Sequence, residues 1–74
     1  MKKVDEVYVL KDTAFFVVVD CGGTQLRHNA FTSEDQWEAI EFASKVKLAG
    51  IINPAYWTEI SAVFFERIES NFFH

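Results

Sequence analysis

Hydrophobic residues dominate two short segments near the start of the chain, residues 4–10 and 14–20, and a polar break at 11–13 separates them. Both segments are rich in Val, Phe and Tyr, which are residue types enriched in β-strands. The pattern therefore predicts a strand, a turn and a second strand. Because the run 14–19 is apolar on both sides, we expect the second strand in the middle of a sheet, where its backbone groups are covered.

The Gly22-Gly23 pair follows the second predicted strand. Glycine adopts the positive φ angles that a two-residue primed turn requires, so the pair predicts a tight reversal and a third strand over residues 24–31. This register pairs Val19 with Leu26 on a mostly apolar face. The opposite face of the hairpin is half polar, and we assign it to solvent or to a partner.

Two helical patterns occupy the second half of the chain. The first is expected to begin at Thr32 or Ser33, where Ser33 and Gln36 have the spacing of a capping box, and to end at Gly50. The second is expected to begin at Asn53-Pro54, with Asn53 as the cap. Its apolar stripe consists of Trp57, Ile60, Phe64 and Ile68, while Glu59, Phe65, Glu66 and Glu69 point away from that stripe.

These elements predict one α+β domain over residues 1–74. A three-stranded antiparallel β-meander is followed by two antiparallel α-helices that pack on one face of the sheet, in the order β-β-β-α-α. A chain of 74 residues buries only about 60% of its unfolded surface, which suffices for a single core.

The sequence predicts neither a membrane-spanning segment nor a secretory signal. Its longest apolar run, residues 14–19, is far shorter than the roughly 20 residues that span a bilayer. Asp5 and Glu6 interrupt the apolar segment that a secretory signal needs. The single Cys21 allows no internal disulfide. We therefore expect a cytoplasmic protein with no membrane partner.

The formal net charge is −4, and the excess lies entirely in the second half of the chain. After Thr32 the sequence carries seven acidic residues against three basic ones, whereas up to Thr32 it carries four of each. A nucleic-acid binder needs a basic stripe that displaces counterions from phosphates. The charge pattern therefore argues against direct nucleic-acid binding.

The run Asp20-Cys21-Gly22-Gly23-Thr24 with Arg27 resembles the first phosphate loop of the sugar kinases in the actin-like ATPase superfamily. The resemblance implies that Asp20 and Thr24 hold nucleotide phosphate. It covers eight residues, whereas that family also needs a second phosphate loop and an adenosine site from a much longer two-domain fold. We therefore favour a plain hairpin turn, and a phosphate-binding enzyme that uses this loop stays as an alternative.

Other catalytic arrangements find little support in the sequence. The predicted register holds Cys21 and His28 roughly 13 Å apart, at four residues along a strand, whereas proton transfer needs about 3 Å between heavy atoms. The Cys and His residues lack the paired spacing of a zinc site. The helix carboxylates are expected in solvent, where their pKa values have no reason to shift. We predict no enzyme, no metal and no cofactor.

The remaining signal is a surface of aromatic and acidic side chains. Aromatic anchors surrounded by charge are typical of protein interfaces. The predicted partner-binding residues are Trp37, Phe65, Phe72, Phe73, Glu38, Glu41, Glu59 and Glu66. The alternative is that the tail with Phe72 and Phe73 folds back over the edge of its own sheet and that Trp37 caps the core.

The preferred function is that of a small, acidic, non-catalytic module that docks on a larger protein with a basic surface. Phage-encoded inhibitors that occupy the nucleic-acid-binding surface of a host protein are similar in size and charge, which makes an inhibitor the concrete form of this hypothesis. A homodimer that buries the same aromatic side chains, with oligomerisation as its main role, is the first alternative.

Overall fold

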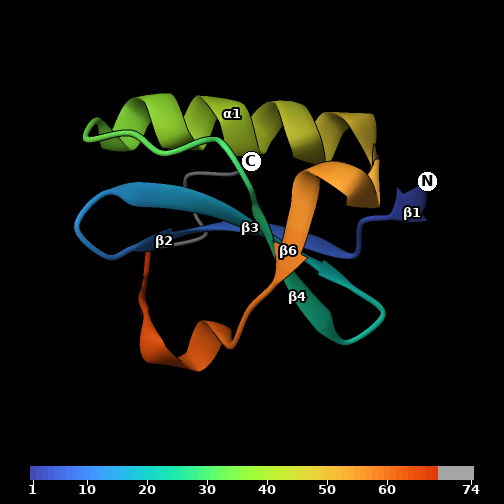
Figure 1. Cartoon of the computed structure of the whole chain (residues 1–74). Coiled ribbons are helices and arrows are strands. Elements are labelled where there is room, and N and C mark those ends of the chain that lie inside the picture. The colour runs from blue at the N-terminus through green and yellow to red at the C-terminus, as the bar shows by residue number, and fades with distance from the viewer. Residues whose placement is uncertain (69–74) are drawn as a thin grey trace.

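The structure is a computed structural model, which describes residues 1–68 (Figure 1). Its elements are β1 (Lys2–Lys3), β2 (Glu6–Lys11), β3 (Phe15–Cys21), β4 (Thr24–His28), α1 (Gln36–Ala49), β5 (Ile51–Ile52), the 3-10 turn η1 (Pro54–Tyr56), β6 (Trp57–Glu59), the 3-10 turn η2 (Ala62–Phe64) and β7 (Glu66–Arg67). Five strands form one antiparallel sheet in the order β6-β4-β3-β2-β7, and β1 pairs with β5 in a separate two-stranded sheet. The helix α1 covers one face of the large sheet.

The three central strands of the large sheet are the predicted meander. In the first hairpin Val9 lies opposite Val17. In the second hairpin Val19 lies opposite Leu26, as the sequence register predicts. Gly22 and Gly23 have φ angles of 61° and 86°, which are the positive values that a two-residue primed turn requires. The third strand ends at His28, three residues earlier than expected.

The helix α1 begins later than the capping-box pattern predicts. Asp35 is its N-cap, and its side chain accepts a hydrogen bond of 2.9 Å from the backbone N–H of Trp37. The backbone of Ser33 pairs instead with Phe15, the first residue of β3, which fixes Ser33 outside the helix. Gly50 ends the helix in the left-handed conformation, with a φ angle of 75°.

The predicted second helix does not form, and the predicted fold class is wrong. Asn53 does cap a first turn, because its side chain accepts a hydrogen bond from the N–H of Ala55, but the turn ends at Tyr56. The rest of the segment forms β6, η2 and β7. Aromatic and β-branched residues are frequent in residues 56–68 and favour strands. The two edges of the meander also offer unpaired backbone groups, which β6 and β7 satisfy.

One core lies between α1 and the large sheet. Its buried side chains are Val7, Val9, Val17, Val19, Cys21, Leu26, Ala39, Ile40, Ala43, Ile52 and Trp57. The helix contributes three of them from a single face. This is the face on which the sequence pairs Val19 with Leu26, so its assignment to the interior is confirmed.

A second core lies on the opposite face of the sheet. Residues 60–65, which we call the crossing segment, run from β6 at one edge to β7 at the other, below the sheet in Figure 1. The side chains Ile60, Ala62 and Phe65 of this segment pack on Tyr8, Leu10, Phe16 and Val18. The assignment of this face to solvent or to a partner is therefore wrong, because the chain covers it with its own C-terminal part.

Candidate functional site

The glycine turn between β3 and β4 already binds carboxylates of its own chain. The N–H of Gly22 donates to Asp5 Oδ2 at 2.8 Å, and the N–H of Gly23 donates to Asp20 Oδ1 at 3.1 Å. A phosphate loop offers such amide groups to an anion. Here two carboxylates accept from them, so a phosphate would have to displace one negative group and lie beside the other.

Cys21 and His28 do not form a catalytic pair. Cys21 lies opposite Thr24 at the turn, whereas His28 lies opposite Trp57 on β6. Burial raises the pKa of the Cys21 thiol, and the nearby Asp5 carboxylate raises it further. The thiol therefore stays protonated at neutral pH, which makes it a poor nucleophile.

His28 organises the loop between β4 and α1. Its Nδ1 accepts hydrogen bonds from the N–H groups of Ala30 and Phe31, at 3.2 and 3.0 Å. An Nδ1 that accepts carries no proton, so the imidazole is neutral with its proton on Nε2. Desolvation lowers the pKa of His28 below its ordinary value. The ring also makes edge-on contacts with Phe42 and Trp57, with centroid distances of 5.1 and 5.0 Å.

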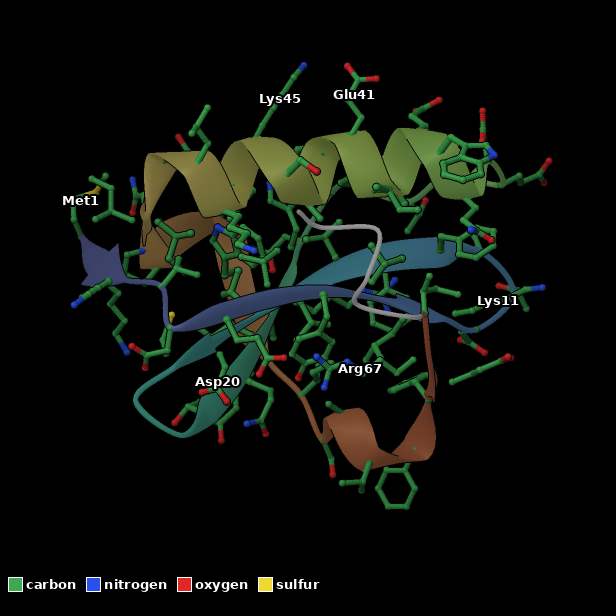
Figure 2. All side chains as sticks on the ribbon, turned by 180° about the vertical axis from the view of Figure 1, so that it is seen from behind. Met1, Lys11, Asp20, Glu41, Lys45 and Arg67 are labelled. Atoms are coloured by element: carbon green, nitrogen blue, oxygen red, sulfur yellow. The ribbon has the colours of Figure 1, made fainter. Side chains whose placement is uncertain are left out.

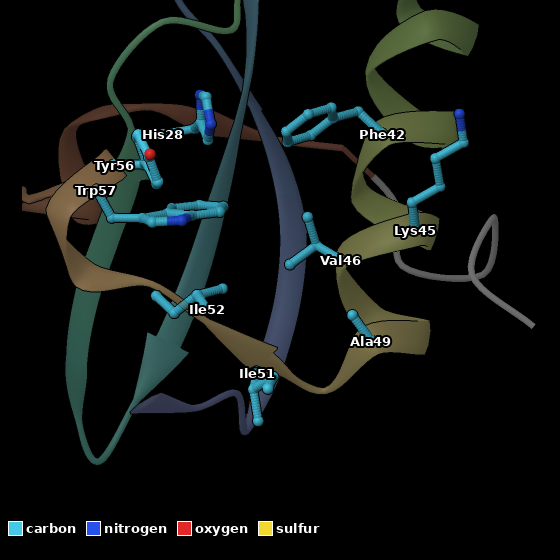
Figure 3. A pocket seen from close by; sticks show the side chains of 9 residues that line it. All are labelled: His28, Phe42, Lys45, Val46, Ala49, Ile51, Ile52, Tyr56 and Trp57. Atoms are coloured by element: carbon cyan, nitrogen blue, oxygen red, sulfur yellow. The ribbon is translucent and has the colours of Figure 1, made fainter. Parts of the chain in front are cut away.

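A shallow groove of about 290 Å³ lies beside His28. Figure 3 shows side chains of α1 facing those of β5, η1 and β6 across it. Its lining consists of His28, Phe42, Lys45, Val46, Ala49, Ile51, Ile52, Tyr56 and Trp57. No carboxylate belongs to this lining, and its single ammonium group, that of Lys45, lies 3.4 Å from Glu41. The walls of the groove are therefore mostly apolar, and the imidazole of His28 and the ammonium group of Lys45 are the ionisable nitrogen groups in its lining.

The outer face of α1 carries the most prominent combination of aromatic and acidic side chains. Trp37, in the first turn, is 63% exposed. Glu34, Asp35, Glu38 and Glu41 are exposed around it along one end of the helix. Figure 2 shows Glu41 and Lys45 pointing away from the sheet. Three of the predicted partner-binding residues, Trp37, Glu38 and Glu41, thus lie together.

Three other predicted partner-binding residues, Glu59, Phe65 and Glu66, do not join this surface. Glu59 and Glu66 lie on the edge strands β6 and β7, at opposite sides of the sheet, rather than on a helix. Phe65 packs edge-on against Phe16 with a centroid distance of 5.1 Å, so its predicted outward orientation is wrong. Phe72 and Phe73 lie outside the described residues.

Sequence reasoning missed two exposed apolar positions on η2. Val63 is 86% exposed and Phe64 is 82% exposed, although the helical pattern placed Phe64 in the apolar stripe. A 3-10 turn replaces the helix here and changes which side chains point outward. Their exposure follows from the path of the crossing segment, so the local sequence held no signal for it.

No protein-family model, curated protein or solved structure matches the chain. Within residues 1–68, no group of three or more His, Cys, Asp and Glu side chains is placed to hold a metal ion. In the same part of the chain, α1 is too short and too polar to cross a bilayer.

Proposed function

We propose that this protein is a non-catalytic, cytoplasmic binding module that docks on a larger protein with a basic surface. The observation that carries the proposal is Trp37, a large aromatic side chain that is 63% exposed among carboxylates on a capped helix. In its concrete form, the docked surface is one that the partner uses to bind nucleic acid, so that docking inhibits that binding.

The position of Trp37 suits it to the role of an interface anchor. Tryptophan is enriched among the residues that contribute most to binding between proteins, and a rigid support lowers the entropy lost on docking. The backbone N–H of Trp37 is tied to Asp35, and the next turn of α1 is anchored by the buried Ala39 and Ile40. The anchor thus projects from a fixed backbone.

The charge around Trp37 indicates the chemistry of the partner. Glu34, Asp35, Glu38 and Glu41 surround the first two turns of α1 and are exposed. Complementary charge accelerates association and selects partners, so the opposing surface is expected to be rich in Lys and Arg. A surface that binds nucleic acid has this composition.

The geometry described above also favours binding over catalysis. The glycine turn donates to carboxylates, the Cys21 thiol is buried and protonated, and the Nδ1 of His28 is occupied by two backbone N–H groups. The buried thiol and the lack of a second cysteine fit the reducing conditions of the cytoplasm.

Capture from a lysate of the organism that encodes the protein tests the proposal. Immobilised wild-type protein should retain a basic protein, and Trp37→Ala should lose it at an unchanged fold. Tyr56→Ala is the matched control, because Tyr56 is 61% exposed but lies beside the groove. The captured protein should lose affinity for nucleic acid when the wild-type chain is added. Retention by Trp37→Ala that equals wild type would contradict the proposal.

A further inference from the structure

The outer face of α1 carries a self-complementary stripe. Trp37, Glu41, Ser44 and Leu48 follow one another with spacings of four, three and four residues, which is the spacing of the seam between paired helices. Trp37 at one end is 63% exposed and Leu48 at the other is 89% exposed. At about 1.5 Å per residue the two apolar side chains are roughly 17 Å apart along the helix.

The charges of α1 are separated along the same direction. Glu38 and Glu41 lie in its first half, and Lys45 and Lys47 lie in its second half. A parallel pair of such helices would set acidic groups against acidic groups, whereas an antiparallel pair sets acidic groups against basic ones. The macrodipoles of two helices also favour the antiparallel arrangement.

We propose that this face binds a second copy of the same chain, through an antiparallel contact between the two α1 helices about a two-fold axis. The axis passes between Glu41 and Ser44, midway along the stripe. Trp37 then packs on Leu48 of the second copy, and Leu48 packs on Trp37 of the second copy. A two-fold contact of this kind is closed, so association stops at the dimer.

The centre of the stripe suits a close approach of the two helices. Ser44 is small, and its hydroxyl already donates to the carbonyl of Ile40 at 2.8 Å, so it has a partner when the contact excludes water. Glu41 comes near Lys45 of the second copy. Within one chain these two residues form an ion pair of 3.4 Å with side chains that are 70% and 75% exposed, and such a pair exchanges partners at little cost.

The size of the contact determines its strength. A helix of 14 residues is about 21 Å long, and interfaces that bury less than about 1,200 Å² belong to weak, reversible complexes. The dimer is therefore expected to be populated at high micromolar concentration and above. Because it covers Trp37, it competes with the binding of the basic partner, and the protein is competent for docking as a monomer.

Sedimentation equilibrium of the isolated chain, from low micromolar to millimolar concentration, tests the contact. Wild type should change from monomer to dimer over this range without larger species. Trp37→Ala and Leu48→Ala should each raise the dissociation constant at least tenfold, with unchanged circular dichroism. Phe64→Ala is the matched control, because Phe64 is 82% exposed on η2, away from α1, and it should have no effect.

A charge swap tests the direction of the two helices. Glu41→Lys and Lys45→Glu should each dimerise more weakly than wild type, because each sets like charges against each other across the axis. An equimolar mixture should form a heterodimer at least tenfold more stable than either homodimer, since both contacts then pair opposite charges. A monomer at every concentration, a dimer lost in Phe64→Ala instead, or no gain on mixing would overturn the proposal.

Leu48→Ala also distinguishes this inference from the proposed function. Leu48 is three turns away from Trp37, so this variant should lose self-association and still be retained by a basic partner. Capture that depends on Trp37, from a chain that is monomeric throughout, would reject the dimer alone.

Discussion

The two faces of the large sheet bury similar side chains, but different kinds of secondary structure cover them. On one face, a regular helix packs on Val9, Val17 and Val19. On the other, the crossing segment covers Phe16 and Val18 without forming a helix. The adjacent residues Val17 and Val18 are both 0% exposed and point to opposite faces. A strand that is apolar on both sides must therefore be covered on both sides. Only one of the two covering segments needs to be a regular helix.

The helix α1 and the crossing segment are stabilised by different interactions. The helix α1 has a capped start, a left-handed end and one apolar face. The crossing segment is held by a backbone hydrogen bond of 3.0 Å from Ile60 to Gln25 and by the short strands at its two ends. Just beyond β7, the N–H of Ile68 donates to the carbonyl of Val9 at 2.9 Å. The stability of the crossing segment therefore depends on the sheet that it covers, and we expect it to open before the helix does.

Phe16→Ala should have the largest effect of any single change on the crossing-segment face. Phe16 is fully buried and contacts the ring of Phe65 edge-on. Removal of a buried Phe side chain costs about 3–5 kcal/mol, which is most of the stability of a domain of this size. Urea unfolding measures the loss, and Phe16→Leu should recover more than half of it. A cost below about 1 kcal/mol would mean that the crossing segment does not cover this face in solution.

The pair Val17→Ala and Val18→Ala compares the two faces directly. Each change removes two buried methyl groups from the same strand, so each should lower the free energy of unfolding by about 2–3 kcal/mol. Equal losses would show that the irregular cover packs as well as the helix. If Val18→Ala cost less than a third of Val17→Ala, the second core would be loosely packed.

His28 makes the helix-covered side sensitive to pH. Its pKa is lowered in the folded chain by desolvation, so between that value and the ordinary imidazole value of 6.5 the unfolded chain binds more protons. Stability is therefore complete above about pH 6.5 and falls as the pH drops below it. A protonated Nδ1 also donates where it now accepts from Ala30 and Phe31. Urea unfolding across this pH range should show the decline in wild type.

Two substitutions at His28 separate the contribution that its hydrogen bonds make to stability from the contribution of its charge. His28→Ala removes both acceptor contacts and should cost about 1–2 kcal/mol at neutral pH. His28→Asn keeps a short side-chain acceptor for the following N–H groups but does not titrate, so it should recover part of that loss. Its stability should change less than that of wild type between neutral and mildly acidic pH. A decline in His28→Asn that equals the wild-type decline would assign the pH dependence to other groups.

Arg67→Gln should have the smallest effect, at the edge of the crossing-segment face. Arg67 lies over the ring of Tyr8, at 4.3 Å from its centroid, and pairs with Glu6. Its side chain is 46% exposed, so its loss should cost less than about 1 kcal/mol. Burial raises the pKa of Tyr8 and Arg67 lowers it, so the variant should raise that pKa further. Ultraviolet titration in a Tyr56→Phe background measures this shift, and an unchanged pKa would place Arg67 away from Tyr8.

The local sequence was sufficient wherever neighbouring residues determine the structure. Gly22 and Gly23 predict the reversal, and the alternating pattern around them predicts the register of Val19 with Leu26. The same reasoning located α1 within a few residues and its end at Gly50. Asn53 and Pro54 predicted a helical start correctly, but no local signal showed that it would last a single turn.

The candidate site could be predicted only in part for the same reason. Trp37, Glu38 and Glu41 share one surface because they belong to one helix, and their spacing was readable. Phe65 was assigned outward from a helical period that the segment does not have, and it lies against Phe16. The groove beside His28 joins residues from five separate elements, so no pattern along the chain contains it.

The sequence by itself determined the meander, the helix α1 and the acidic surface that this helix presents, because each depends on contacts between residues close in the chain. The tertiary structure decided the conformation of residues 56–68. Their helical spacing favoured a helix, whereas two unpaired sheet edges and the uncovered Phe16 and Val18 favoured an extended path that satisfies both. Those contacts join residues far apart in sequence, and their sum exceeds the few kcal/mol by which local preferences differ.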